Sequence, residues 1–116
     1  MKRLFFPLFA GLLWLMSGTL SAAERTYNVL FIQSYTKNTP WHSLLTENLE
    51  NGLKKGGVRA NIITEYLNAD YWSFASECFI MRRICQRARQ RKTDLIVTSS
   101  DEAFFTLTHC GDSLPY

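Results

Sequence analysis

Three short apolar segments alternate with longer segments of helical periodicity along the chain. The apolar segments are rich in β-branched and aromatic residues, which predicts strands over residues 27–32, 58–67 and 94–98. The first and third are almost continuously apolar, as is typical of strands covered on both faces. Strands separated by helices favour parallel pairing with right-handed crossovers. The pattern therefore predicts an α/β fold, an open parallel sheet with helices on both faces in the order β-α-β-α-β-α.

The polar and turn-forming residues predict where the helices begin and end. In the first helix, Thr39 is expected to be the N-cap with Pro40 at the first helical position, and the glycines at 56–57 to end it. In the third helix, Ser99–Glu102 fits a capping box and Gly111 ends the helix. The second helix carries one continuous apolar stripe, at Phe74, Cys78, Met81, Cys85 and Ala88.

The N-terminal residues have the pattern of a secretory signal peptide. Lys2 and Arg3 form a basic segment, residues 4–16 are apolar, and Ser21 and Ala23 suit the two small positions before a cleavage site. The apolar segment is shorter than the roughly 20 residues of a membrane-spanning helix. We therefore expect export to the periplasm, with an uncleaved anchor as the alternative.

Cleavage after Ala23 would leave residues 24–116 as a partial α/β ligand-sensing domain, and it changes the charge balance. The chain has 13 Lys and Arg against 10 Asp and Glu, but two of the basic residues precede the cleavage site. The remaining part is nearly neutral, so the charge does not indicate a nucleic-acid partner. The basic segment at residues 82–92 is interpreted as the solvated side of a helix. Binding of this segment to anionic lipid or nucleic acid is disfavoured, because aromatic residues are not interleaved with its charges.

The three cysteines leave the disulfide pattern open. Cys78 and Cys85 are seven residues apart on one predicted helix, about 10.5 Å along its axis, which is too far for a disulfide between them. Either of them could pair with Cys110 in an oxidising compartment. Buried free thiols are the favoured interpretation, because the apolar stripe gives Cys78 and Cys85 a packing role.

Polar and aromatic side chains follow all three predicted strands. Ligands of open parallel α/β sheets bind outside the carboxyl ends of the strands, where helix N-termini also favour polar or anionic groups. Tyr66, Asn68 and Asp70 are at the end of the second strand, and further polar and aromatic residues follow the first and third strands. Each side chain taken alone has a structural alternative as a cap or a core residue. Taken together they predict a small-molecule site, for which the candidates are Ser34, Tyr35, Trp41, Ser100 and Asp101.

Motifs for catalysis, nucleotide binding and metal binding are missing from the sequence. There is no G-x-S-x-G, G-x-G-x-x-G or G-x-x-x-x-G-K-[ST] segment and no C-x-x-C. The two histidines, His42 and His109, do not have metal-ligand spacing. No catalytic residue, no cofactor and no metal are therefore expected, and His42 as a general base is the weak alternative.

The motifs taken in order resemble a known family. They are the Q-S-Y turn at 33–35, the P-W pair at 40–41, the segment D-L-I-V at 94–97 and S-D-E at 100–102. The chain resembles the periplasmic sensing domains of bacterial two-component sensor histidine kinases, hybrid sensors included. These domains are related to type I periplasmic binding proteins and to the substrate-binding-protein-like family of ABC transporters. The resemblance extends over residues 27–116.

The resemblance implies a fold of two α/β lobes with a ligand cleft between them, of which this chain would supply the first part of one lobe. The chain would be a truncated, extracytoplasmic, small-molecule-sensing region for signal transduction, without a kinase core and without enzymatic activity. The resemblance implies a small-molecule ligand and no nucleic-acid partner. It also implies a homodimer if the chain is part of a sensor kinase, and membrane attachment only through a downstream anchor. The alternatives are a soluble periplasmic binding protein of an ABC transporter and a small secreted hydrolase that uses His42.

Overall fold

The computed structural model describes residues 25–111, which form three strands and three helices in alternation. The expectations for residues 1–23, the signal peptide included, lie outside the described residues. The elements in chain order are β1 (Thr26–Gln33), α2 (His42–Lys55), β2 (Arg59–Tyr66), α3 (Phe74–Gln90), β3 (Leu95–Ser99) and α4 (Ser100–Cys110).

The three strands form one parallel sheet in the order β2-β1-β3, which confirms the predicted fold class. β1 is central and pairs with β2 over its whole length and with β3 over its second half. Gln33 is in register with both Tyr66 and Ser99, the last residues of the neighbouring strands. All three strands therefore end at the same level, and the loops that follow them share one edge of the sheet.

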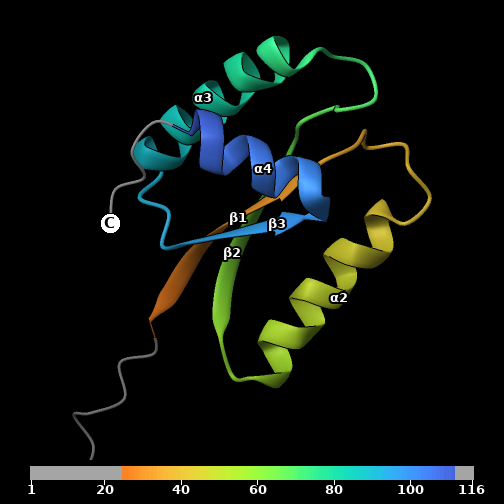
Figure 1. Cartoon of the computed structure of the whole chain (residues 1–116). Helices are drawn as coiled ribbons and strands as arrows, with labels where there is room; N and C mark the ends of the chain where they lie inside the picture. Colours follow the sequence, from red (N-terminus) through yellow and green to blue (C-terminus); the bar gives the residue numbers. More distant parts are fainter. Residues whose placement is uncertain (1–24, 112–116) are drawn as a thin grey trace, which may run out of the picture.

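Helices cover both faces of the sheet (Figure 1). Leu30 and Ile32 of β1 belong to the hydrophobic core that α3 and α4 close, together with Leu67, Met81, Ile84, Cys85, Ala88, Ala103 and Leu107. Val29 and Phe31, which alternate with them and are also buried, point to the face on which α2 lies. α2 itself has no fully buried residue. The larger part of the core is therefore on the α3–α4 side.

The start of α2 differs from the prediction. The helix begins at His42, and Trp41 occupies the N-cap position without a side-chain cap. The Thr39 hydroxyl instead donates to the Thr36 carbonyl oxygen at 2.9 Å, and the backbone N–H of His42 donates to the Thr39 carbonyl oxygen. Residues 36–41 thus form turns that use the Thr39 side chain before the helix starts. The prediction that Thr39 caps the helix with Pro40 in its first turn was wrong.

The predicted capping box of α4 was also wrong. Ser99 is at the N-cap position but makes no side-chain cap, and Glu102 accepts a hydrogen bond from the Tyr35 hydroxyl. The orphan N–H of Ala103 in the first turn donates to the Ser34 hydroxyl at 2.9 Å. A residue from the end of β1 therefore caps α4, an arrangement that local sequence spacing does not reveal.

A disulfide joins α3 to α4 between Cys78 and Cys110, whose Cα atoms are 5.1 Å apart. The favoured prediction of buried thiols was wrong for this pair and is right for Cys85, which is buried in the core outside the disulfide. The choice between Cys78 and Cys85 depends on which side of α3 contacts α4. Cys78 lies on that side, whereas Cys85 lies among the core residues beneath the helix.

Candidate functional site

The carboxyl ends of the three strands and the segments that follow them are joined by hydrogen bonds. The backbone N–H groups of Leu67 and Ala69 donate to the carbonyl oxygens of Gln33 and Ser34, both at 2.8 Å. The Ser34 hydroxyl donates to the Ser99 carbonyl oxygen at 2.6 Å. We call this connected region the carboxyl rim, and it comprises residues 33–35, 41–42, 66–70 and 99–102.

Ser34 is at the centre of the carboxyl rim and is completely buried. Its hydroxyl donates to Ser99 and accepts from Ala103, so that one oxygen connects the end of β1 to the end of β3 and to the first turn of α4. Such a hydroxyl has one donor and two acceptor positions, so the donor and one acceptor position are in use. Ser34 is thus a structural residue beneath the rim, and its predicted contact with a ligand stays a prediction.

Tyr35, the residue after Ser34, connects the aromatic and acidic parts of the rim. Its hydroxyl donates to Oε1 of Glu102 at 2.8 Å. Its ring lies edge-on to that of Trp41, with 6.3 Å between the centroids and an interplanar angle of 88°. The Trp41 side chain is 49% exposed, a large fraction for an indole. The rim therefore presents an accessible aromatic surface directly beside a carboxylate.

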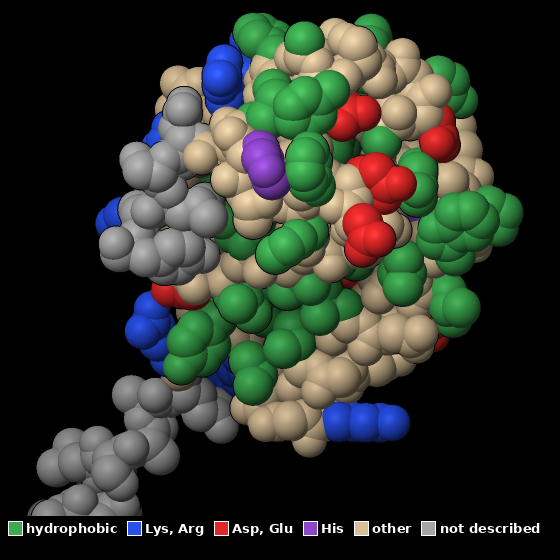
Figure 2. All heavy atoms as spheres, in the orientation of Figure 1, with side chains coloured by type: hydrophobic (Ala, Val, Ile, Leu, Met, Phe, Trp, Pro, Cys, Tyr) green, Lys and Arg blue, Asp and Glu red, His purple; other side chains and the backbone are tan. Residues whose placement is uncertain are grey.

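Negative charge surrounds the Tyr35 phenol. The hydrogen bond to Glu102 raises the pKa of Tyr35 above its usual value, and desolvation adds to the effect. The charges of Glu102, Asp70 and Asp101 raise that pKa further, since they disfavour the phenolate. Figure 2 shows acidic side chains gathered over the start of α4 with hydrophobic side chains next to them. The rim is therefore an acidic surface with aromatic groups.

His42 and Tyr66 form a second pair in the rim. The Tyr66 hydroxyl is 2.6 Å from Nε2 of His42, and the two rings are tilted against each other with centroids 4.8 Å apart. Burial raises the pKa of the Tyr66 phenol. The first residue of α2 is thereby connected to the last residue of β2, and the imidazole has a tyrosine as its partner.

Ser100 occupies the junction between β3 and α4 and is exposed. Its φ of 68° is in the left-handed region, which residues other than glycine adopt at a cost. This conformation turns the chain from the strand directly into the helix without an intervening loop. The side chains of Ser100 and Asp101 are therefore on the exposed start of α4, next to Tyr35 and Glu102.

All five predicted residues lie in the carboxyl rim, and four of them have a contact or a charge effect there that the structure specifies, Ser100 being the exception. Ser34 connects the loops, Tyr35 and Trp41 form the aromatic surface, and the charge of Asp101 acts on the Tyr35 phenol. Sequence reasoning missed Glu102, which it assigned to a capping box, and the pairing of Tyr66 with His42. The available signal was that Tyr66 ends β2 and that Glu102 is in the first turn of the helix after β3, because both positions are at the same edge of the sheet.

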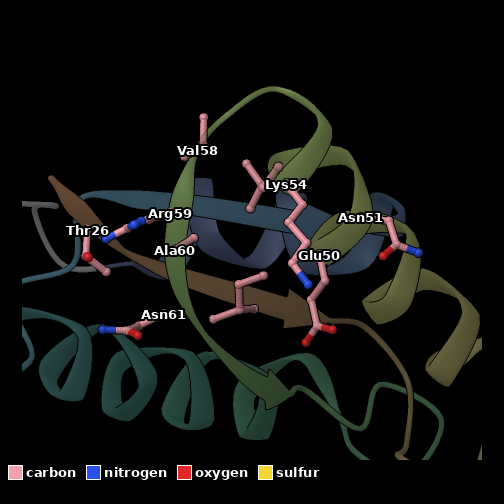
Figure 3. Close-up of a pocket in the computed structure, with 10 residues that line it drawn as sticks. Thr26, Glu50, Asn51, Lys54, Val58, Arg59, Ala60 and Asn61 are labelled. Atoms are coloured by element: carbon pink, nitrogen blue, oxygen red, sulfur yellow. The ribbon is translucent and has the colours of Figure 1, made fainter. Parts of the chain in front are cut away.

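A cavity of about 470 Å³ lies elsewhere, between the C-terminal half of α2 and the start of β2 (Figure 3). Glu50 and Lys54 reach from α2 into this space, and Arg59 and Asn61 are on the strand beneath them. It lies near the amino ends of β1 and β2, opposite to the edge at which ligands of open α/β sheets bind. We therefore take the carboxyl rim as the candidate site.

The part of the chain between residues 25 and 111 contains no grouping of three or more His, Cys, Asp or Glu side chains suited to a metal ion. None of its helices has the length and apolar character needed to cross a membrane. Comparison of the chain with protein-family models, with curated proteins and with solved structures gave no match.

Proposed function

We propose that the chain binds a small molecule at the carboxyl rim and is the extracytoplasmic sensing region of a two-component sensor. The observation that carries the proposal is the arrangement of Tyr35, Trp41 and Glu102, an exposed indole and a phenol held against a carboxylate. A loop needs none of these groups for connection alone.

The strand order supports this position for the site. In open α/β sheets the crevice for a ligand opens where successive connections leave toward opposite faces, and in the order β2-β1-β3 this point is between β1 and β3. Ser34 and Tyr35 are in the loop that follows β1, and Ser100 and Asp101 are in the first turn of α4, which follows β3 directly. The hydrogen bonds of Ser34 and Tyr35 hold this loop and the start of α4 in a fixed relative position before any ligand arrives, which lowers the cost of ordering the site.

The chemistry of the rim supports a particular kind of ligand. The face of an indole offers van der Waals contact and attracts cations, and nearby carboxylates accept hydrogen bonds and favour positive charge. A small molecule with a flat or apolar part and an amino group satisfies both requirements. In a sensor, such a ligand acts by shifting the equilibrium between two arrangements of the domain toward the one that it binds more tightly.

Three features support an extracytoplasmic sensor. The order of motifs resembles that of periplasmic sensing domains, the first 23 residues have the pattern of a signal peptide, and a disulfide of the Cys78–Cys110 type persists in oxidising compartments. A soluble binding protein of an ABC transporter is the rival. The coding DNA after Tyr116 separates them, since a membrane span and kinase core support the sensor and a stop codon after a second lobe supports the transporter.

The binding proposal is tested by fluorescence of Trp41. In a Trp72→Phe background and after signal removal, Trp41 is the remaining tryptophan. Free amino acids, biogenic amines and neutral sugars are titrated separately against this protein. We expect a saturable change with at least one amine or amino acid and about tenfold weaker binding after Asp101→Asn or Tyr35→Phe.

Lys54→Gln is the matched control, because it changes one charge at the opposite end of α2 and should leave the affinity unchanged. If no compound in the three classes changes the emission or the melting temperature, or if Asp101→Asn and Lys54→Gln bind alike, the proposed site is wrong.

A further inference from the structure

The outer face of α3 exposes large aromatic side chains. Phe79 at the centre of this face is 60% exposed, and Trp72 in the preceding loop is 51% exposed. The two border an apolar groove of about 460 Å³, together with Ala75, Ser76 and Ile80. Core residues of α3 such as Met81 and Cys85 are on the other side of the helix, so Phe79 does not serve the core of residues 25–111.

Arginines follow Phe79 along α3. The guanidinium of Arg83 lies over the Phe79 ring, 5.8 Å from its centroid. Arg82 is exposed next to Arg83, and Arg89 is exposed about two helical turns further along α3. Figure 2 shows Lys and Arg side chains next to hydrophobic ones along α3. We call the surface formed by residues 72, 79, 82, 83 and 89 the α3 outer face.

These arginines have no acidic partner in the described part of the chain. Glu65 accepts from Arg87 and Arg91, on the flank of α3 toward β2. Within residues 25–111, Arg82, Arg83 and Arg89 form no salt bridge. Exposed positive charges that no carboxylate of residues 25–111 neutralises are available to an external anion.

We propose that the α3 outer face binds the surface of an anionic phospholipid membrane. An exposed phenylalanine and tryptophan at one end of a row of arginines match a surface that carries negative headgroups above an apolar layer. Trp72 and Phe79 enter the headgroup region while the arginines remain at the phosphates. From the sequence, lipid binding was disfavoured because aromatic residues are not interleaved with the charges of residues 82–92. The aromatic side chains come from outside that segment: Trp72 is in the loop before α3, and Phe79 is one helical turn before Arg83.

A nucleic acid fits the same charges less well. Binding of single strands uses several aromatic rings spaced along a basic groove, and here two rings border one short apolar groove. Asp70 of the acidic carboxyl rim comes just before the N-terminal end of α3, so the positive surface does not continue past that end. The proposal is independent of the proposed ligand site, since no residue of the α3 outer face belongs to the rim.

The test is co-sedimentation of the purified protein with vesicles. One set contains about one third phosphatidylglycerol in phosphatidylcholine, and the other contains phosphatidylcholine alone. We expect binding to the first set that weakens when salt is raised from about 0.05 M to about 0.5 M, as screening shortens the range of the charges. Arg82→Gln/Arg83→Gln should bind about 10- to 30-fold more weakly, whereas Arg82→Lys/Arg83→Lys should retain binding.

Matched controls separate this surface from net charge and from general hydrophobicity. Lys54→Gln/Lys55→Gln also removes two positive charges, but from α2, and Leu44→Ala removes an apolar side chain of α2 that is about as exposed as Phe79. Both controls should bind like the unmodified protein, and Phe79→Ala should lose most of the binding that remains at high salt. Equal losses in the two double Gln variants, equal binding to both vesicle sets, or binding to neither set would overturn the proposal. A melting curve for each variant verifies folding.

Discussion

Two neighbouring side chains at the end of β1, Ser34 and Tyr35, face different surroundings. Ser34 is buried and satisfies backbone groups of β3 and α4, whereas Tyr35 is partly exposed among carboxylates. In a strand, successive side chains point in opposite directions. The same alternation continues just past β1, where Ser34 is buried and Tyr35 is partly exposed. One residue therefore fixes the rim and the next forms its surface.

Replacement of Ser34 by alanine should destabilise the protein by about 1–3 kcal/mol, because it leaves a buried N–H and a partly buried carbonyl oxygen without their partner. Urea denaturation monitored by circular dichroism measures the change. Ser43→Ala, at an exposed position of α2, is the control and should change the stability by less than about 0.5 kcal/mol. Equal stability of the two variants would mean that Ser34 does not cap α4.

The Tyr35 phenol should titrate above pH 10.0, its usual pKa, because Glu102 and the nearby carboxylates disfavour the phenolate. The absorbance change on ionisation, taken as the difference between the protein and Tyr35→Phe, gives this pKa. In Glu102→Gln the pKa of Tyr35 should fall toward 10.0. An unchanged titration in Glu102→Gln would show that the hydrogen bond is not the cause.

The same pKa shift predicts how stability depends on pH. Because the folded pKa of Tyr35 is above the unfolded value, its contribution to stability is complete below pH 10.0. Above that pH the unfolded chain releases the proton first, so the free energy of unfolding decreases until the folded pKa is passed. The decrease should be smaller in Glu102→Gln than in the unmodified protein.

At the scale of elements, the packing of α3 against α4 depends on both apolar contact and the disulfide. The bond between Cys78 and Cys110 closes a segment with a sequence separation of 32 residues. In the chain-entropy model a closed loop of this length stabilises the folded state by about 3–4 kcal/mol. This is a large share of the stability of a small domain, which is typically about 5–15 kcal/mol.

Reduction, or the double variant Cys78→Ser/Cys110→Ser, should therefore lower the free energy of unfolding by up to about 3–4 kcal/mol. Denaturation with and without reductant measures the effect, and the reductant should have no further effect on the double variant. Thiol titration of the denatured, unreduced protein should detect one thiol, that of Cys85. Three thiols would show that the disulfide is absent.

The bounds of the elements show which predictions depended on local and which on distant residues. The strands were predicted within one residue at each end, because burial imposes its period on the sequence itself. The stripe of α3 was only partly right: Met81, Cys85 and Ala88 are buried, whereas Phe74 is 48% exposed. The caps of α2 and α4 were wrong, because Thr39 is used in a turn and the cap of α4 comes from Ser34, far away in sequence. A spacing rule cannot identify a partner that only the fold brings near.

At the scale of the whole molecule, the sheet has two unpaired edges within residues 25–111, at β2 and at β3. β3 pairs with β1 on one side, and no strand within residues 25–111 pairs with its other side. Leu95 on this strand is 47% exposed. An open apolar edge is a template for pairing with another chain. The purified protein should therefore associate reversibly at high concentration.

Leu95→Lys should raise the fraction of monomer in sedimentation-velocity experiments, because a charge on an edge strand opposes pairing. Leu44→Lys, at an exposed position of α2, is the matched control and should leave association unchanged. If both variants reduce association equally, exposed apolar surface in general and not the β3 edge is responsible. A protein that stays monomeric at all concentrations contradicts the prediction.

The sequence by itself determined the fold class and the edge of the sheet at which the candidate residues lie. The order of apolar periods fixes alternating strands and helices, and parallel pairing places the carboxyl ends of all strands on one side. The five candidate residues were therefore expected at one edge of the sheet, and their binding of a ligand stays a prediction. The tertiary structure alone decided how they are connected: Ser34 to α4, Tyr35 to Glu102, Tyr66 to His42 and Cys78 to Cys110. The physical reason is that periodicity encodes which side of an element is buried, whereas a specific contact depends on how two elements distant in sequence are placed against each other.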